Sequence, residues 1–332
     1  MSSITRIVFI SGHFFGKTVL QSILDSPPFR KGKLAIDLVL CLHPRYAINT
    51  VGYSNIADFC ISNGLNYFVF NSVKSKEVFD ILIRTYHDFL LVIGLSQLIP
   101  SEILDLSMHH TKNNSRFSES HGAIGMHPTL LPIGRGRAPI PWTILKELKN
   151  TGVSVFFLDN GADTGPIISQ DIFQISDIET AYTLFNKVAD SHYQLGKIIS
   201  LYLAEKKVRS VIQDELQVSV WPKRIPRDGW IDFENKSIDI VRLVNATTHP
   251  YPGSFFVYKD QTIIVSDASI SLCNYRIEKS LPGLILEVDQ SGCPHICTTD
   301  GVVRLCTRNQ DVDYQIGEYI SSYQTKVLDN NA

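Results

Sequence analysis

The first two-thirds of the chain alternates short apolar runs with amphipathic segments, and this alternation constrains the fold more than any other feature. The apolar runs are continuous, as expected of strands that are buried on both faces of a sheet. Strands are predicted at residues 6–11, 36–42, 67–71, 89–94, 123–126 and 153–158. Helices are predicted at residues 17–24, 56–63, 76–85 and 179–205. The alternation favours an α/β fold with a Rossmann-like, doubly wound, mostly parallel sheet.

The character of the chain changes after about residue 205. Short β-type runs then follow one another, separated by turn residues, at 217–221, 254–258, 262–265, 284–288 and 302–306. This pattern predicts a small β-rich C-terminal domain of the OB-like barrel type. A chain of 332 residues is long enough for two domains, and we place them at residues 1–205 and 206–332.

Charge and composition exclude several classes of protein. The chain has 31 Lys and Arg against 33 Asp and Glu, so no broad basic surface for nucleic acid or an anionic membrane is expected. No apolar run approaches the roughly 20 residues of a membrane span. Its six cysteines are scattered, which is typical of reduced thiols in a cytoplasmic protein. Cys293 and Cys297 lack the second ligand pair of a structural zinc site, so no metal is predicted.

Two loops rich in Gly and Pro each present one residue suited to proton transfer. His127 stands in Gly125-Met-His-Pro-Thr-Leu-Leu-Pro132, and Asp163 stands in Gly161-Ala-Asp-Thr-Gly165. An imidazole beside a carboxylate can handle a proton or stabilise an oxyanion. A structural histidine and a loop-capping aspartate are the alternative. Both loops follow predicted strands, so we expect them to meet at the carboxyl edge of the sheet.

Further segments contain residue types that are suited to binding a substrate. Arg135 and Arg137 flank Gly136, and a guanidinium recognises phosphate or carboxylate well, although a solvated surface role is equally compatible. Tyr251 lies in an aromatic, Pro-rich segment, and Trp230 is nearby; such rings stack on nucleobases or simply pack between domains. The polar stretch 105–122 is predicted to be a loop, either a mobile surface loop or a lid over the site.

These segments resemble the N10-formyltetrahydrofolate-dependent formyltransferase family. His127-Pro-Thr-Leu-Leu-Pro132 is similar to its His-x-Ser-Leu-Leu-Pro signature, and Arg135-Gly-Arg-Ala-Pro-Ile-Pro-Trp142 is similar to the segment that follows. Thr151-Gly-Val153 and Ala162-Asp-Thr-Gly165 match the next two blocks in order. The resemblance continues into the C-terminal region at Leu281-Pro-Gly-Leu-Ile-Leu286, so it covers most of the chain.

The resemblance implies formyl transfer from N10-formyltetrahydrofolate to a primary amine. It implies that His127 stabilises the tetrahedral oxyanion and that Asp163 keeps His127 charged and helps to remove the amine proton. The residues implied to hold the pterin are Gln97, Leu98, Ile99, Asp159, Gly161 and Ala162. The residues implied to hold the acceptor are Arg135, Gly136, Trp230 and Tyr251.

The acceptor is expected to be a nucleotide-linked amino sugar, used for surface polysaccharide, because the segments at Arg135 and His249 resemble members with that activity. Methionyl-tRNA formyltransferases share the architecture and are the alternative enzyme. A third alternative is a catalytically silent protein that binds folate or a sugar nucleotide. The expected partner is thus a small molecule rather than a membrane or a nucleic acid, and a homodimer is compatible with every alternative.

One position departs from the family pattern. The family places Asn two residues before the catalytic His, where its amide helps to hold the oxyanion, and this chain has Gly125 there. A backbone N–H, a water molecule or a side chain from the 105–122 stretch would have to substitute for that amide. Asn114, Ser120 and His121 are the candidates within the stretch.

Overall fold

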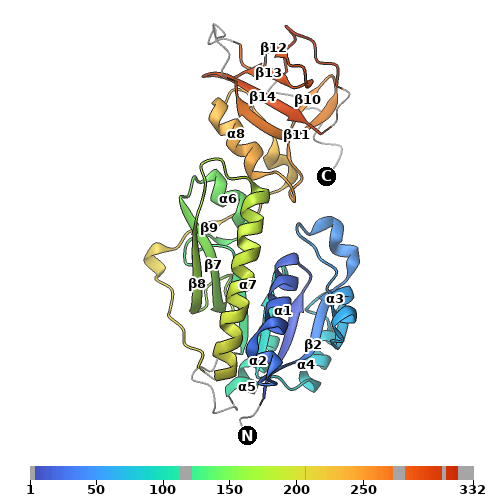
Figure 1. The fold of residues 1–332 in the computed structure, drawn as a ribbon, viewed down its shortest axis with the longest axis vertical. Helices are drawn as coiled ribbons and strands as arrows, with labels where there is room; N and C mark the ends of the chain where they lie inside the picture. Colours follow the sequence, from blue (N-terminus) through green and yellow to red (C-terminus); the bar gives the residue numbers. More distant parts are fainter. Residues whose placement is uncertain (1–3, 113–121, 206, 272–280, 309–311, 321–332) are drawn as a thin grey trace. The chain divides into compact units, whose positions relative to one another are not determined.

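A computed structural model describes residues 4–112, 122–205, 207–271, 281–308 and 312–320. The chain divides into two compact units. The first consists of Met1–Pro139, Asn150–Ile175 and Phe185–Pro222. The second consists of Ile140–Lys149, Ser176–Leu184 and Lys223–Ala332. Figure 1 shows the elements of each unit.

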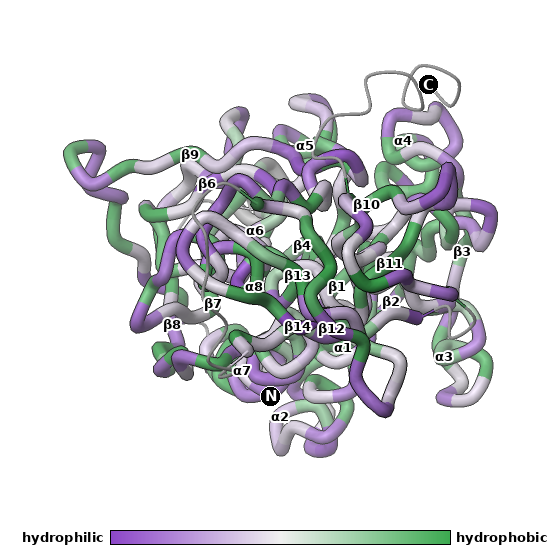
Figure 2. The backbone as a smooth tube through the Cα atoms, turned by 90° about the horizontal axis from the view of Figure 1, so that it is seen from above, coloured by the Kyte–Doolittle hydropathy of each residue, from purple (hydrophilic) through white to green (hydrophobic). Residues whose placement is uncertain are grey.

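The first unit is built on a seven-stranded sheet in the order β3-β2-β1-β4-β5-β7-β8. Its strands are β1 (Thr5–Ser11), β2 (Leu34–Leu42), β3 (Tyr67–Phe70), β4 (Phe89–Ile93), β5 (Ala123–His127), β7 (Asn150–Phe157) and β8 (Ile167–Gln174). The first five are parallel. Figure 2 colours the backbone by hydropathy, with hydrophobic residues in green. The predicted mostly parallel α/β sheet is confirmed, and every predicted strand up to residue 158 is present.

The sheet ends differently from what strand–helix alternation predicts. Strand β7 is antiparallel to β5, and β8, which we did not predict, is antiparallel to β7. A hairpin loop of nine residues joins β7 to β8, where a parallel strand would need a longer crossover. Strand β8 alternates half-buried and exposed residues, and this weak apolar signal explains why the sequence did not reveal it.

The helices of this unit begin and end at recognisable signals. They are α1 (Phe14–Asp25), α2 (Pro27–Arg30), α3 (Ile56–Asn63), α4 (Lys76–Arg84) and α5 (Ser101–Lys112), with a 3-10 turn at Pro44–Asn49. His13 Nδ1 accepts the Phe15 amide proton at 3.0 Å and caps α1, and Ser75 caps α4 in the same way. The long helix α7 (Ala181–Glu205) crosses from the second unit into the first.

Helix α5 corrects the prediction of a loop from residue 105. Residues 105–112 continue the helix that begins at Ser101, with the buried Ile103 and Leu104 as its apolar contacts. Polar residues in its second half misled the prediction, because short helix faces that meet solvent have the same composition as loops. Asn114, Ser120 and His121 lie outside the described residues.

The second unit is built on a five-stranded antiparallel sheet in the order β10-β11-β14-β13-β12. Its strands are β10 (Ser254–Tyr258), β11 (Gln261–Ile270), β12 (Ile285–Val288), β13 (Pro294–Cys297) and β14 (Val302–Thr307). The helices α6 (Pro139–Leu145) and α8 (Ser237–Ala246) and a 3-10 turn at Pro226–Gly229 complete the described elements. Ile240 and Val244 of α8 pack with Phe256 in one buried core.

This sheet confirms a separate β-rich C-terminal part, although the described strand pairings form an open order rather than a closed barrel. The last stretch of the first compact unit runs to Pro222, and the boundary that we placed between residues 205 and 206 stays a prediction. Main-chain pairing connects the residues after 205 to the first unit. Strand β9 (Val220–Trp221) pairs with β6 (Arg135–Gly136), and Val211 exchanges two backbone hydrogen bonds of 2.8 Å with Ile167. Most of the strand predicted at 217–221 is absent, and a 3-10 turn, Glu215–Gln217, precedes the short β9.

Candidate active site

His127 is the last residue of β5 and is buried, with 8% of its side chain exposed. Its Nε2 lies 2.7 Å from the carbonyl oxygen of Gly134. A carbonyl only accepts hydrogen bonds, so this contact places a proton on Nε2. The other ring nitrogen, Nδ1, lies 3.7 Å from Asp163 Oδ2. The ring is therefore anchored at one nitrogen and directed toward a carboxylate with the other.

The loop after His127 is fixed by a serine that we did not predict as part of the site. Ser154 on β7 stands opposite His127 in the strand register. Its Oγ donates to the Thr129 carbonyl at 2.7 Å and accepts from the Leu131 amide at 3.0 Å. Gln170 Nε2 donates to the same Oγ at 2.8 Å. These contacts hold the Pro-rich loop, and so His127, on the sheet. A serine inside an otherwise apolar strand was the feature of the sequence that could have indicated this role.

Asp163 reaches His127 by a different route from the one predicted. The antiparallel direction of β7 places Phe157 beside Ile124, at the end of β5 opposite to His127. The loop that follows β7 therefore returns along the sheet to bring Asp163 to the imidazole. Asp163 has a φ of +58°, an uncommon conformation for a residue with a side chain. Its Oδ2 accepts the Gly136 amide proton at 2.9 Å.

Gly136 holds the Asp163 carboxylate through its main chain. Its φ is +109°, and an added Cβ would stand 2.5 Å from the carbonyl oxygen of Trp221. Only glycine fits this backbone. The Gly136 amide donates its hydrogen bond to the Asp163 carboxylate. Gly136 thus positions the Asp163 carboxylate, and the substrate contact that we predicted for Gly136 stays a prediction.

Replacing Gly136 with alanine is expected to lower the free energy of unfolding by about 1–3 kcal/mol, because the new Cβ forces β6 away from β9. The same change should reduce turnover, since the amide that holds Asp163 moves. Urea unfolding and kcat would measure both effects. Gly32→Ala is the matched control, because Gly32 has a φ of +66° and nothing lies within 4 Å of its added Cβ. Equal losses at the two positions would contradict the close approach to Trp221.

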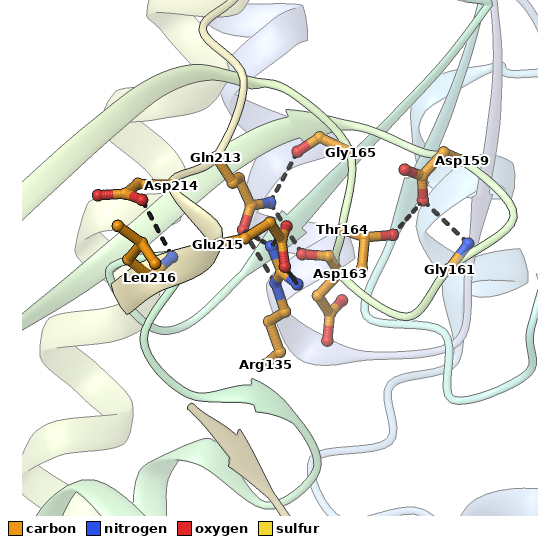
Figure 3. A network of polar contacts seen from close by, with 10 residues as sticks. All are labelled: Arg135, Asp159, Gly161, Asp163, Thr164, Gly165, Gln213, Asp214, Glu215 and Leu216. Carbon is orange, nitrogen blue, oxygen red and sulfur yellow. Dashed lines mark hydrogen bonds and ion pairs between the residues drawn. The ribbon is translucent and has the colours of Figure 1, made fainter. Parts of the chain in front are cut away.

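Arg135 is buried inside the protein, with 6% of its side chain exposed. Its Nε and Nη2 donate to Gln213 Oε1 at 3.0 and 2.9 Å. Its Nη1 and Nη2 donate to the Glu215 carboxylate at 3.2 and 2.7 Å (Figure 3). The guanidinium is thus engaged by the protein's own acceptors, and the role in acceptor binding that we predicted for Arg135 stays a prediction.

The residues predicted to hold the pterin lie in two loops of the first unit. Residues 97–99 follow β4, where Gln97 accepts the Val73 amide proton at 2.8 Å and donates to the Asn71 carbonyl at 3.3 Å. Its side chain thus fixes the loop, while Leu98 is 67% exposed. An exposed apolar side chain such as Leu98 suits the face of a flat heterocycle, and the main-chain groups of the loop suit its polar edge.

The second loop, which contains Gly161 and Ala162, is exposed, and hydrogen bonds between its own residues hold its conformation. Asp159 Oδ1 accepts the Gly161 amide proton at 3.0 Å and the Thr164 hydroxyl proton at 2.6 Å (Figure 3). The Asp159 carboxylate therefore shapes the turn that leads to Asp163. The contact of this loop with a pterin stays a prediction.

The space beside Gly125 is filled by apolar side chains. An added Cβ would stand 2.7 Å from Leu158 Cδ2 and 3.3 Å from two ring atoms of Phe156. Gly125 pairs with Phe156 across the strands, so the two rows of side chains face each other. In this chain a leucine and a phenylalanine occupy the region where the family pattern has an amide.

Trp230 and Tyr251, which we predicted to bind the acceptor, belong to the second unit. Trp230 contacts Phe255 edge to face, with ring centroids 5.5 Å apart. Tyr251 is half-buried, its amide donates to the Thr248 carbonyl at 3.0 Å, and burial raises the pKa of its hydroxyl. The Trp230 ring thus packs within the second unit, and the role of both rings toward an acceptor stays a prediction.

Two buried histidines of the first unit, His13 and His192, are neutral near pH 7. Burial lowers the pKa of His13 to about 4 and the pKa of His192 to about 3. His192 stacks on Phe15 at 4.6 Å and donates from Nδ1 to the Val188 carbonyl at 2.7 Å. Burial opposes protonation of this ring, and it outweighs the hydrogen bond to the Val188 carbonyl, which favours the protonated form.

The buried state of His192 predicts an acid-sensitive fold. In the unfolded chain this ring binds a proton below the ordinary histidine pKa of 6.5. In the folded chain it stays unprotonated down to about pH 3. The free energy of unfolding should then fall as pH drops through this window, by about 1.4 kcal/mol per pH unit for each such ring. Urea unfolding at pH 7 and pH 5 measures the slope, and His192→Leu should make it shallower. An unchanged slope in that variant would contradict the assignment.

The described part of the chain holds neither a metal cluster nor a membrane span. There, no three His, Cys, Asp or Glu side chains are arranged to hold a metal ion. None of the described helices combines the length and the apolar character that a bilayer crossing requires.

Comparison with known proteins identifies the family. Residues 5–197 match the family model described as formyl transferase, and residues 224–312 match formyl transferase, C-terminal domain. The methionyl-tRNA formyltransferase of Clostridium tetani is 29% identical over 233 residues, which are 69% of each chain. The chain therefore belongs to the formyl transferase family and is a formyltransferase.

Solved structures share the fold. The sugar 3N-formyltransferase WlaRD, crystallised with dTDP and 5-N-formyl-THF, has a TM-score of 0.63 at 18% identity, and the match covers 92% of this chain and 99% of WlaRD. The N-formyltransferase of Helicobacter canadensis, in complex with folinic acid and dTDP-3-aminofucose, has a TM-score of 0.63 at 16% identity, with 92% of this chain and 100% of that one covered.

Proposed function

We propose that this formyltransferase moves the formyl group of N10-formyltetrahydrofolate to the primary amine of a nucleotide-linked amino sugar. The formyl donor follows from the family. The acceptor is the finer part of the proposal, and it rests on the charge of the second unit together with the segments at Arg135 and His249.

The geometry around His127 supports direct transfer. A neutral amine attacks the formyl carbon, and the carbonyl oxygen becomes an oxyanion. The tetrahedral intermediate then collapses: the bond between the formyl carbon and N10 breaks, and N10 takes up the proton that the amine has lost and leaves as tetrahydrofolate. Gly134 occupies Nε2, so the Nδ1–H of a protonated His127 is the donor available to that oxyanion. Asp163, 3.7 Å from Nδ1, stabilises the positive imidazole ring, and we assign to its carboxylate the acceptance of the proton that the amine loses.

Gly125 increases the dependence on His127. Leu158 and Phe156 fill the region beside Gly125, and neither side chain can donate a hydrogen bond. We therefore assign the main side-chain contribution to oxyanion stabilisation to His127. A main-chain N–H or a residue of the 113–121 stretch, which lies outside the described residues, stays the proposed second donor.

The charge of the C-terminal region favours a small acceptor over tRNA. Residues 223–332 contain 11 Lys and Arg against 14 Asp and Glu. Several of the cations are also paired within the unit: Arg242 with Asp239 at 2.6 Å, and Arg304 with Asp289 at 2.6 Å. A tRNA-binding surface needs unpaired cations to neutralise phosphates. An excess of acidic residues is compatible with a single nucleotide diphosphate and unfavourable for a polynucleotide.

The test compares two acceptors with one formyl donor. The proposal predicts turnover of a dTDP-linked amino sugar, with kcat/KM that changes little between low and physiological salt. Formylation of methionyl-tRNA, with an affinity that falls steeply as salt rises, would replace the proposal by the alternative enzyme. Tight binding of folate with no turnover of any amine would indicate a catalytically silent binding protein. Cytoplasmic location, a role in surface polysaccharide and a homodimer stay predictions.

A further inference from the structure

Two separate arms hold Asp163, one on its side chain and one on its main chain. The Gly136 amide donates to Oδ2 at 2.9 Å. On the other side, Gln213 Nε2 donates to the Asp163 carbonyl at 2.9 Å and to the Gly165 carbonyl at 2.7 Å (Figure 3). Together these contacts determine both the backbone and the carboxylate of a residue with a strained φ of +58°.

The partners of Gln213 determine the orientation of its amide. Arg135 can only donate, and it meets Oε1 with two N–H groups at 3.0 and 2.9 Å. The two carbonyls can only accept, and they meet Nε2. Gln213 is buried, with 5% exposure, so exchanging its oxygen and nitrogen would leave unpaired groups on both sides.

Arg135 connects the two arms. Its side chain holds Gln213, and its neighbour in the chain, Gly136, holds the Asp163 carboxylate. Arg135 and Gly136 form β6, which pairs with β9, and Gln213 precedes β9 by a few residues. The segment after the long helix α7 thus returns to the active site of the first unit and closes a ring of contacts around Asp163.

We propose that Gln213, oriented by Arg135, is a positioning residue for Asp163 in formyl transfer. This inference rests on the proposed function, because it assigns Gln213 an effect on turnover through Asp163. Gln213 touches neither substrate in this account. It keeps the Asp163 loop in the conformation that directs the carboxylate at His127.

Gln213→Glu tests the proposal because it keeps the acceptor for Arg135 and removes the donor to the two carbonyls. We expect kcat to fall by about 10- to 100-fold, with KM for both substrates unchanged within about threefold, since small displacements of a catalytic group cost turnover rather than binding. In an Asp163→Ala background the same change should cost nothing further. Gln217→Glu is the matched control, because exposed Gln217 lies in the 3-10 turn that follows Gln213 and its side chain donates to Asp214 at 2.8 Å.

The inference would be overturned if Gln213→Glu lowered kcat equally in the Asp163→Ala background. It would also be overturned if the variant raised KM and left kcat unchanged. Gln213→Asn, which has the same groups on a shorter side chain, serves in the same cycle if Gln213→Glu does not fold. Hydrogen exchange of the Gly136 amide gives a readout without turnover: Gln213→Glu should accelerate it on the order of tenfold. Unchanged exchange would overturn the inference even if wild type formylates no amine, whereas lack of wild-type turnover alone would count against the proposed function.

Discussion

Replacing His127 with alanine is expected to lower kcat for formyl transfer by about 10²–10³-fold, because the oxyanion loses its principal donor. The effect should lie at the upper end of that range. Gly125 provides no side chain, and Leu158 and Phe156 fill the space beside it. Steady-state kinetics with a dTDP-linked amino sugar measure the loss, and the KM for the formyl donor should change little.

The His127→Ala variant needs a control for folding. His127 is buried and anchors on Gly134, so its removal also loosens the loop after β5. Ser154→Ala disturbs the same loop without touching the reacting groups, because Ser154 bonds to Thr129 and Leu131. If Ser154→Ala and His127→Ala lose the same factor of kcat at equal stability, loop geometry rather than the imidazole would account for the effect.

Replacing Asp163 with asparagine is expected to lower kcat by about 10²–10⁴-fold, the range found for loss of a positioned acid–base group. The amide keeps the size of the carboxylate, and its oxygen can still accept the Gly136 amide proton. The change therefore removes the negative charge 3.7 Å from His127 Nδ1 and leaves the loop in place. Kinetics and urea unfolding on the same samples separate the loss of charge from a loss of structure.

Asp214→Asn is the matched control for Asp163→Asn, since Asp214 is exposed and caps the neighbouring turn. It should leave kcat near the wild-type value. Retention of more than half of the wild-type turnover by Asp163→Asn would contradict the role of the carboxylate and would make Asp163 a loop-capping residue only.

The parallel part of the fold was predictable from the sequence because its strands are buried on both faces. The strands β1, β4 and β5 read as nearly unbroken apolar runs, and the motifs around His127 and Asp163 marked the site. Strand direction was not predictable in the same way. Nothing in residues 150–157 distinguishes a parallel from an antiparallel strand, and β8 lacked the apolar signal that would have revealed the hairpin.

The roles of individual polar residues depended on contacts between distant segments. Arg135 has the composition of an anion-binding residue, and only the position of Gln213 and Glu215, some 80 positions along the chain, shows that its guanidinium is engaged. The neighbours of Gly125 were equally hidden, because Leu158 and Phe156 reach it across the sheet. Sequence motifs thus locate the site, whereas the role of each polar residue within it depends on contacts that only the fold reveals.

The most direct test of the account follows the formyl carbon itself. Wild-type protein would be incubated with N10-formyltetrahydrofolate carrying an isotopic label on the formyl carbon and with a dTDP-linked amino sugar, and the products would be examined by NMR and mass spectrometry. The account predicts that the label appears as a formamide on the sugar amine, and that His127→Ala slows its appearance. Release of the label as formate, with the amino sugar unchanged, would contradict it.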